Sequence, residues 1–291
     1  MPKNRQDKTT AADCDRVIIE PRASRADPAL HDPAILCPVG PLIMMAARLF
    51  KARKQLRPFT PASVYTIKTP GAKVSLVGPA WGAPAAVYVL ERMIAHGVRQ
   101  VALVGLCGSL SPEVKIGDLV VPDGALIEEG TSPHYAPGAR LSVPGLSAVQ
   151  ALQKALTAAN KSHHLGPVWT TDAVFRETES RVRAYQEEGC LAVEMECSAL
   201  FTVAAYRGIE LGALLVVSDE LFDLRWRRGF TRPRFLSASR QAFRIALAAA
   251  RELAGISGPG PELESETEVF ASRPENREDK ADDLRADDEE G

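Results

Sequence analysis

The chain has 291 residues, of which 45% are hydrophobic and 25% are charged, so it can bury one sizeable core. The net charge of -2 conceals an asymmetry: residues 259–291 hold thirteen acidic and four basic side chains, which leaves +7 on the rest of the chain. A mildly basic body suits an anionic small molecule. Because no lysine-rich stripe with interleaved aromatic residues occurs, we expect no nucleic-acid partner.

Cysteine usage and hydropathy indicate the compartment. The five cysteines are far apart and form no CxxC pair, which argues against a disulfide framework or a zinc site. No apolar run approaches the roughly 18 residues that a membrane helix needs, and the polar start of the chain predicts no signal peptide. We therefore expect a cytoplasmic protein with no membrane partner. No spacing of His, Asp and Glu forms a ligand set, so we expect no metal or other cofactor.

The chain changes character near His31. Residues 1–30 are charged and broken by prolines, so we predict a mostly disordered segment with a possible edge strand at residues 17–19. Apolar runs and turn residues beyond it predict a strand at 34–40, a helix at 42–55, a hairpin of strands 64–69 and 73–78 around Pro70-Gly71, and a helix from Gly82 to about His96.

Strands and helices alternate over the next part of the chain. We predict strands at 100–109, 118–128 (with a bulge at 122–124), 165–173, 191–196 and 211–218, and helices at 146–160, 179–188, 197–207 and 234–254. This alternation predicts an α/β fold, a three-layer α/β/α sandwich with a mixed, mostly parallel central sheet, in a domain over residues 31–256. Proline, glycine and acidic residues dominate residues 257–291, which predicts an acidic disordered tail.

Carboxylates follow two of the predicted apolar strands. Glu194 and Glu196 end one strand, and Asp219 ends another. Ligands of open parallel sheets collect at the carboxyl ends of strands, so these side chains are candidate site residues. An acid at the start of a helix also faces the positive end of the helix dipole. Glu194 therefore keeps two interpretations, contact with a ligand or support of the helix that follows.

Seven short motifs occur in one order over residues 34–250. They are Gly82-Ala83-Pro84, the segments 104–110 and 116–122, Gly130-Thr131-Ser132 with His134-Tyr135, and the segments 171–175, 193–196 and 217–219. Together they resemble the purine nucleoside/uridine phosphorylase family of the hexameric type, which includes nucleosidases. The resemblance implies a phosphorylase-like fold, a homo-oligomer (dimer or hexamer) and cleavage of the N-glycosidic bond of a nucleoside substrate, by phosphate or by water.

The resemblance also implies roles for the carboxylates. Glu196 would accept hydrogen bonds from the ribose 2′- and 3′-hydroxyls, Met195 would pack on the sugar, and Glu194 would either assist there or serve the helix start. Asp219 would be the catalytic general acid that protonates the leaving base. That role needs a partly buried carboxyl with a raised pKa.

The base pocket is expected around Phe175, which would stack on the base, with Cys107 and Gly108 beside it. In the uridine-specific branch a Gln and an Arg follow this Phe by four and six residues. Those offsets fall here on Glu179 and Arg181, so a carboxylate that cannot donate replaces the amide. This favours a purine over uracil. The alternative for both residues is a solvent-facing helix start.

The nucleophile region departs from the family pattern. Around Gly40 the chain lacks the Asp and the Arg that phosphorylases carry after the first strand. A second arginine position falls on Leu103, and the hydroxyl residue expected after Gly105 is Leu106. A desolvated phosphate needs a cationic partner. Other arginines are possible sources of that charge: Arg48, Arg53, Arg57 and Arg140.

Three functions remain open at this stage. The first is phosphorolysis of a purine-type nucleoside to free base and ribose 1-phosphate, a purine-salvage glycosyltransferase reaction with inorganic phosphate as co-substrate. The second is phosphate-independent hydrolysis, which the apolar residues Leu103 and Leu106 favour. The third is a non-catalytic nucleoside or nucleotide binder. We favour glycosidic cleavage because both the sugar carboxylate, Glu196, and the acid, Asp219, are present.

Overall fold

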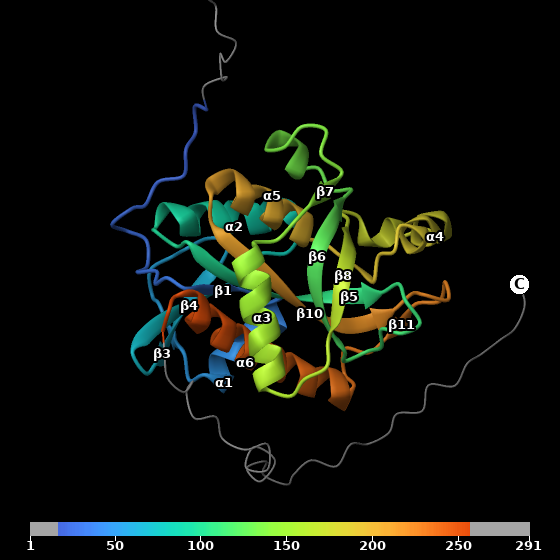
Figure 1. The fold of residues 1–291 in the computed structure, drawn as a ribbon. Coiled ribbons are helices and arrows are strands. Elements are labelled where there is room, and N and C mark those ends of the chain that lie inside the picture. Colours follow the sequence, from blue (N-terminus) through green and yellow to red (C-terminus); the bar gives the residue numbers. More distant parts are fainter. Residues whose placement is uncertain (1–16, 257–291) are drawn as a thin grey trace, which may run out of the picture. The chain divides into compact units, whose positions relative to one another are not determined.

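The computed structural model describes residues 17–256 (Figure 1). None of the helices in this range is long and apolar enough to cross a membrane. The helices are α1 (Gly40–Leu49), α2 (Ala83–Ala95), α3 (Leu146–Ala158), α4 (Glu179–Glu187), α5 (Cys197–Arg207) and α6 (Pro233–Leu253), with the one-turn 3-10 helices η1 (Ser132–His134) and η2 (Val174–Arg176). The strands are β1 (Ala34–Leu36), β2 (Arg53–Lys54), β3 (Ser63–Thr69), β4 (Ala72–Gly78), β5 (Gln100–Ser109), β6 (Leu119–Ile127), β7 (Leu141–Ser142), β8 (His164–Thr170), β9 (Ala192–Glu194), β10 (Glu210–Glu220) and β11 (Arg227–Arg228).

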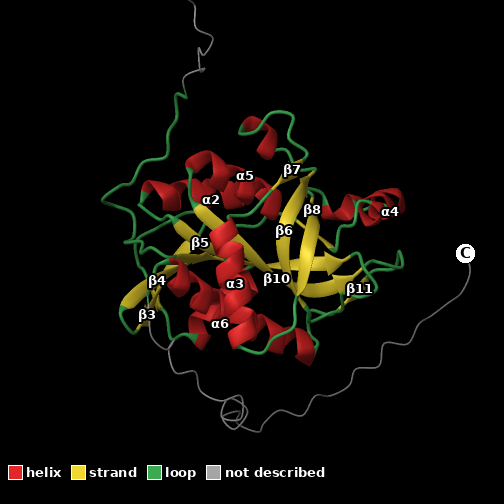
Figure 2. Cartoon of the chain, viewed as in Figure 1, coloured by secondary structure: helices red, strands yellow, loops and turns green. Residues whose placement is uncertain are grey.

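Helices cover both faces of one mixed sheet (Figure 2). One apolar cluster contains the inward side chains of α2 and α5, and a second contains those of α1, α3 and α6. The central strands β5 and β10 are buried along almost their whole length, as expected of strands with helices on both sides. The predicted α/β sandwich with a mixed sheet is confirmed, and its longest strand pairing, β5 with β10, is parallel.

The sheet closes on itself around five strands. The order is β11-β10-β6-β8-β9-β5-β1-β4-β3-β2, and β10 pairs in addition with β5, so that β5, β10, β6, β8 and β9 form a ring of pairings. Register shifts at Pro122/Gly124 in β6 and at Val217/Asp219 in β10 interrupt the ladders. Such bulges bend a strand and increase its twist, which a closed sheet requires. The bulge predicted at 122–124 is confirmed.

Most predicted elements lie within a few residues of their expected place, but one helix is shorter than predicted. The helix expected at 42–55 is α1, which ends at Leu49. Lys51 then adopts a left-handed φ of 49°, and Arg53–Lys54 pairs with β3 as the edge strand β2. The polar residues after Leu49 fit a helical period, so only their pairing with β3 shows that they leave the helix.

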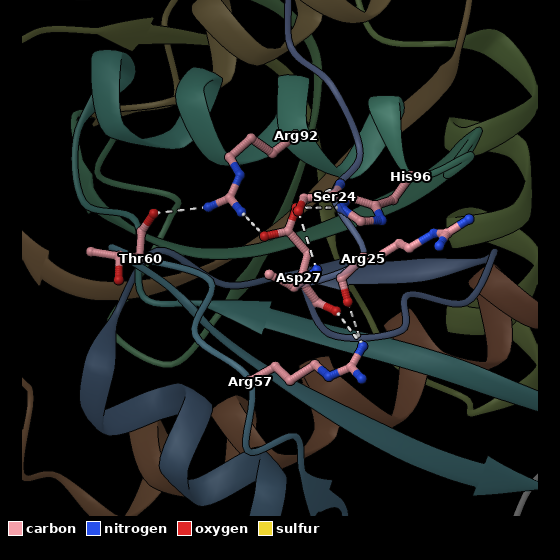
Figure 3. Close-up of polar contacts among 8 residues, drawn as sticks. Ser24, Arg25, Asp27, Arg57, Thr60, Arg92 and His96 are labelled. Carbon is pink, nitrogen blue, oxygen red and sulfur yellow. Dashed lines mark hydrogen bonds and ion pairs between the residues drawn. The ribbon is translucent and has the colours of Figure 1, made fainter.

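The N-terminal arm, residues 17–30, contains no helix or strand, so the edge strand predicted at 17–19 is wrong. Asp27 nevertheless anchors this arm to α2 (Figure 3): its carboxylate accepts from Arg92 Nη2 at 2.7 Å and lies 2.9 Å from His96 Nε2. Arg57 donates to the carbonyl of Arg25 at 2.7 Å. The domain boundaries stay predictions, and the predicted acidic tail at 257–291 lies outside the described residues.

Substitution of Asp27 by asparagine removes the charge that Arg92 and His96 hold. Hydrogen bonds to a charged group contribute about 1.5–3 kcal/mol, so we expect the free energy of unfolding at pH 7 to fall by about that amount in urea titrations. Glu20→Gln, an exposed change in the same arm, should stay within about 0.5 kcal/mol of wild type.

The effect of Asp27→Asn should depend on pH. Burial raises the pKa of Asp27, but the hydrogen bonds from His96 and Ser24 and the charge of Arg92 outweigh it and lower the pKa below 3.8. A carboxyl whose pKa is lower in the folded state stabilises the fold at pH values above its pKa in the unfolded chain. This contribution disappears as the pH falls through the pKa of the folded state. The difference from wild type should therefore shrink below about pH 4. Equal free energies of unfolding of Asp27→Asn and the wild type at pH 7 would contradict the role of Asp27 as an anchor of the N-terminal arm.

Candidate functional site

The two predicted groups of carboxylates lie on either side of Gly108. Strand β9 pairs with β5 through Val193 and Gly108, and β10 pairs with the other edge of β5 through Asp219 and Gly108. A Cβ atom built on Gly108 would lie 3.1 Å from Asp219 Oδ2 and 2.5 Å from Leu221. The position therefore admits only glycine without a shift of its neighbours. The sheet register thus brings the ends of β9 and β10 together, as expected for site residues at the carboxyl ends of strands.

Glu194 is buried, with 4% of its surface exposed, and its carboxylate is fully engaged. Oε2 accepts from the backbone N–H groups of Glu196 at 2.7 Å and Cys197 at 2.8 Å, and Oε1 accepts from the Thr170 hydroxyl. Burial raises the pKa of Glu194, while these hydrogen bonds oppose the rise. Of its two sequence-based interpretations, the helix-start role is the one for which the structure shows contacts.

Glu196 is the N-cap residue of α5 and is 5% exposed. Its Oε1 accepts from the backbone N–H of Gly82 at 2.7 Å. Burial and repulsion from Glu194 raise the pKa of Glu196 well above its ordinary value. The backbone of the loop before α2 thus donates a hydrogen bond to this carboxylate. The sequence around Gly82 predicts the start of α2 but not this contact.

Trp81, which sequence reasoning missed, lies over the same stretch. Its indole Nε1 is 3.1 Å from Met195 Sδ, and 69% of its surface is exposed. Met195, which lies between Glu194 and Glu196 in the sequence, is half-buried. An exposed aromatic ring beside a thioether and a buried acid forms an apolar surface next to a hydrogen-bond acceptor, which suits a sugar. An aromatic residue just before a predicted helix carries no signal for this role.

Asp219 follows the bulge of β10 and is held by two donors. Ser218 Oγ donates to its Oδ1 at 2.6 Å and Trp226 Nε1 donates to its Oδ2 at 2.8 Å. Burial raises the pKa of Asp219, and the two hydrogen bonds only partly counteract it. An oriented carboxyl with a raised pKa is the state that a general acid requires.

The residues predicted for the base have mixed surroundings. Cys107 is buried, and burial, with the charges of Asp219 and Glu194, raises the pKa of its thiol well above the ordinary value, which disfavours the reactive thiolate. Phe175 projects from η2 with 92% of its surface exposed.

The two residues of α4 predicted for the base have partners of their own. Glu179 pairs with Arg183 at 2.8 Å on an exposed face of α4, and Arg181 pairs with Glu128. Neither contact involves Asp219. The interpretation of both side chains as the exposed start of a helix agrees with this geometry.

A further carboxyl that the sequence did not single out belongs to Glu177, which directly follows η2. It is half-buried, and within residues 17–256 its side chain has no hydrogen bond or ion pair. Burial, followed by the negative charges of Asp219 and Glu128, raises the pKa of Glu177 to about 7. Nothing in a polar loop sequence distinguishes this Glu from a solvated one, so only the fold reveals that the charge of Asp219 acts on it.

The nucleophile region is apolar where the family pattern has cations. Leu103 is fully buried, Leu106 is half-buried, and a Cβ at Gly105 would lie 3.0 Å from Leu215. Gly40 begins α1, and a Cβ there would meet no atom within 4 Å.

The alternative arginines are engaged or exposed. Arg57 donates to backbone carbonyls of the N-terminal arm, and Arg140 pairs with Glu188 at 3.3 Å. Arg48 and Arg53 are exposed. In the part of the chain that the structure describes, no group of three or more His, Cys, Asp or Glu side chains is placed to hold a metal ion.

A sequence model of the Phosphorylase superfamily matches residues 33–250, so the chain belongs to this family. A guanosine phosphorylase from Halorubrum lacusprofundi is 31% identical over 151 residues, which cover 52% of this chain and 63% of that protein. A DeoD-type purine nucleoside phosphorylase from Bacillus cytotoxicus is 34% identical over 161 residues, covering 52% and 66%. The chain thus spans slightly less than two thirds of these relatives. A solved uridine phosphorylase from Vibrio fischeri shares the fold, with a TM-score of 0.69 at 21% identity, covering 77% of this chain and 93% of that one.

The contacts of the two buried glutamates predict different stabilities for their variants. Glu194→Ala leaves two backbone N–H groups and the Thr170 hydroxyl without their acceptor, so we expect the free energy of unfolding to fall by about 2–4 kcal/mol in urea titrations. Glu196→Ala removes the N–H bond from Gly82, a weaker backbone interaction with Met195 and a repulsive charge, so its loss should be at least about 1 kcal/mol smaller. Equal losses would mean that Glu194 does not hold the start of α5.

Proposed function

We propose that this protein is a cytoplasmic, homo-oligomeric purine-salvage enzyme that cleaves the N-glycosidic bond of a purine nucleoside by phosphorolysis, giving free base and ribose 1-phosphate. The observation that carries the proposal is that Glu196, at the N-cap of α5 just after β9, and Asp219, on β10, follow or lie on the two strands that pair with β5 at Gly108. Two relatives that bear the names guanosine phosphorylase and purine nucleoside phosphorylase support it. No cofactor is needed, because the reaction requires only a proton and a nucleophile.

The ribose would lie against Met195 and Glu196. Cleavage passes through an oxocarbenium-like sugar, so groups that hold the hydroxyls more strongly in the transition state accelerate it. The Glu196 carboxylate accepts from the 2′- and 3′-hydroxyls, and the N–H of Gly82 fixes its orientation at 2.7 Å. Trp81, in contact with Met195, covers the sugar.

The base would lie near Asp219, whose carboxylate approaches the backbone of Gly108 because that residue has no side chain. Asp219 would donate a proton to a purine ring nitrogen as the bond to the ribose breaks, and the burial that raises its pKa favours this role. Ser218 and Trp226 hold both carboxyl oxygens, which keeps the acid pointed at one position. Phe175 stacks on the base from η2.

Water as the nucleophile is the second candidate, and a specific observation favours it. Leu103 and Leu106 replace a cation and a hydroxyl that would hold phosphate, and a buried dianion without a positive partner is costly. Phosphorolysis therefore requires an arginine from elsewhere, for which a neighbouring subunit is the proposed source. Hydrolysis requires none.

Base release from guanosine, inosine, adenosine and uridine, with and without phosphate, tests the proposal. We expect release from purine nucleosides that requires phosphate. We expect Asp219→Asn to lower kcat/KM by about 10²–10⁴, the usual contribution of general acid catalysis. Asp123→Asn, an exposed change in the β6 bulge, should retain wild-type activity.

The same assay separates the other functions. Release that is independent of phosphate would replace phosphorolysis by hydrolysis. Saturable nucleoside binding without release from any nucleoside would leave a binding protein. Full activity of Asp219→Asn would remove Asp219 from the role of general acid.

A further inference from the structure

Thr170 ends β8 as a fully buried residue whose hydroxyl has two defined partners. The backbone N–H of Ser198 donates to Thr170 Oγ1 at 3.0 Å. Because an N–H group can only donate, the hydroxyl oxygen is the acceptor there, and its own proton is directed to Glu194 Oε1. The parallel register of β8 and β9 places Thr170 directly opposite Glu194, which accounts for this contact.

A second buried carboxylate, that of Glu129, fixes the far end of this contact. Ser198 Oγ donates to Glu129 Oε1 at 3.0 Å, and the Glu129 carboxylate also accepts from the backbone N–H groups of Thr131 and Ser132. Glu129 is 3% exposed, and Ser198 and Thr170 are fully buried. A buried network whose members all have partners is rigid. The N–H that Ser198 presents to Thr170 is therefore held in place from both sides.

The bond from Thr170 determines how the Glu194 carboxylate is oriented. Rotation of a glutamate carboxyl about its last torsion is soft, so one held oxygen does not fix the group. Oε2 accepts from the backbone N–H groups of Glu196 at 2.7 Å and Cys197 at 2.8 Å. The Thr170 hydroxyl holds the other oxygen, Oε1. Without this hydroxyl the carboxylate can turn about Oε2, and the backbone of Glu196 loses its fixed acceptor.

We propose that Thr170 is a positioning residue for the ribose contact of Glu196, a role that rests on the proposed nucleoside cleavage. Because Thr170 is fully buried, it acts through Glu194 and not on the substrate. Glu194 holds the backbone from which the Glu196 side chain extends, and the N–H of Gly82 holds its carboxylate. Groups that contact a transition state must be held to within about 0.5 Å of their productive positions. Loss of the bond behind Glu196 should therefore weaken its hold on the sugar.

The 2′-hydroxyl of the substrate provides a direct measure of this role. Glu196 is proposed to accept from the 2′- and 3′-hydroxyls, and a 2′-deoxynucleoside keeps only the second of these. A change that misplaces Glu196 therefore weakens two contacts with guanosine and one with 2′-deoxyguanosine. A change that only destabilises the fold affects both substrates alike. The ratio of kcat/KM for guanosine to that for 2′-deoxyguanosine thus separates a positioning role from a structural one.

Thr170→Val, which keeps the shape of the side chain and removes the hydroxyl, tests the inference. We expect the guanosine-to-2′-deoxyguanosine ratio to fall about five- to tenfold, within the range for groups coupled through one hydrogen-bond network. Thr170→Ser restores the hydroxyl and should recover most of the wild-type ratio. If Thr170→Val does not fold by circular dichroism, Thr170→Cys takes its place. A thiol is a weak donor, so the ratio should fall there too, by a smaller factor.

Thr202→Val is the matched control. The Thr202 side chain is also buried, and its hydroxyl bonds to Ser142 and to the carbonyl of Ser198, but no bond joins it to Glu194 within residues 17–256. The substitution removes the same atoms from the same layer of the fold. We expect a lower free energy of unfolding and an unchanged ratio.

Glu196→Gln, measured beside these variants, separates the inference from the proposed function. A ratio that falls in Glu196→Gln but not in Thr170→Val would overturn the inference and leave the ribose contact intact. If Glu196→Gln keeps the ratio, the proposed ribose contact fails, and the inference fails with it. If the wild type releases no base from any nucleoside, nucleoside cleavage itself fails. Dissociation constants for guanosine and 2′-deoxyguanosine, measured by calorimetry, then replace kcat/KM: a lower ratio of affinities in Thr170→Val supports the inference, and an unchanged one overturns it.

Discussion

The carboxylate of Glu194 joins three elements on which the site depends. It accepts from Thr170 at the end of β8 and from the two N–H groups that open α5, and it is itself the last residue of β9. A buried charge persists only where such donors surround it. Because Glu196 lies two residues further on, at the N-cap of α5, its position follows from these bonds. Glu194, through its contacts at the start of α5, thus places the acid proposed to hold the ribose.

Around this anchor lie carboxyls whose pKa values burial raises, and repulsion from neighbouring carboxylates adds to the rise at Glu196 and Glu177. Asp219 and Glu177 are affected in the same direction as Glu196, and the positions where the family pattern has a cation and a hydroxyl are occupied by Leu103 and Leu106. The environment favours keeping a proton near a leaving base. Within residues 17–256 it provides little for a phosphate dianion, so the proposed departure of the base and the supply of a phosphate nucleophile place opposite demands on the site.

The sequence predicts those features that depend on local pattern. The hairpin around Pro70-Gly71, the buried strand at 100–109 and the carboxylates at strand ends follow from alternation, turn residues and apolar runs. The end of α1 does not, because residues 51–55 fit a helical period until they pair with β3. The anchor at Asp27 depends on Arg92, 65 residues away. The two interpretations of Glu194 could be separated only by hydrogen bonds that no sequence pattern encodes.

The most direct test of the account is a crystal structure of the protein with phosphate and a purine nucleoside analogue whose base is joined to the ribose by a carbon–carbon bond that the enzyme does not cleave. The account predicts the ribose hydroxyls on the Glu196 carboxylate and a ring nitrogen of the base within hydrogen-bond distance of Asp219. An analogue bound elsewhere, or bound without contact to Glu196 and Asp219, would contradict it.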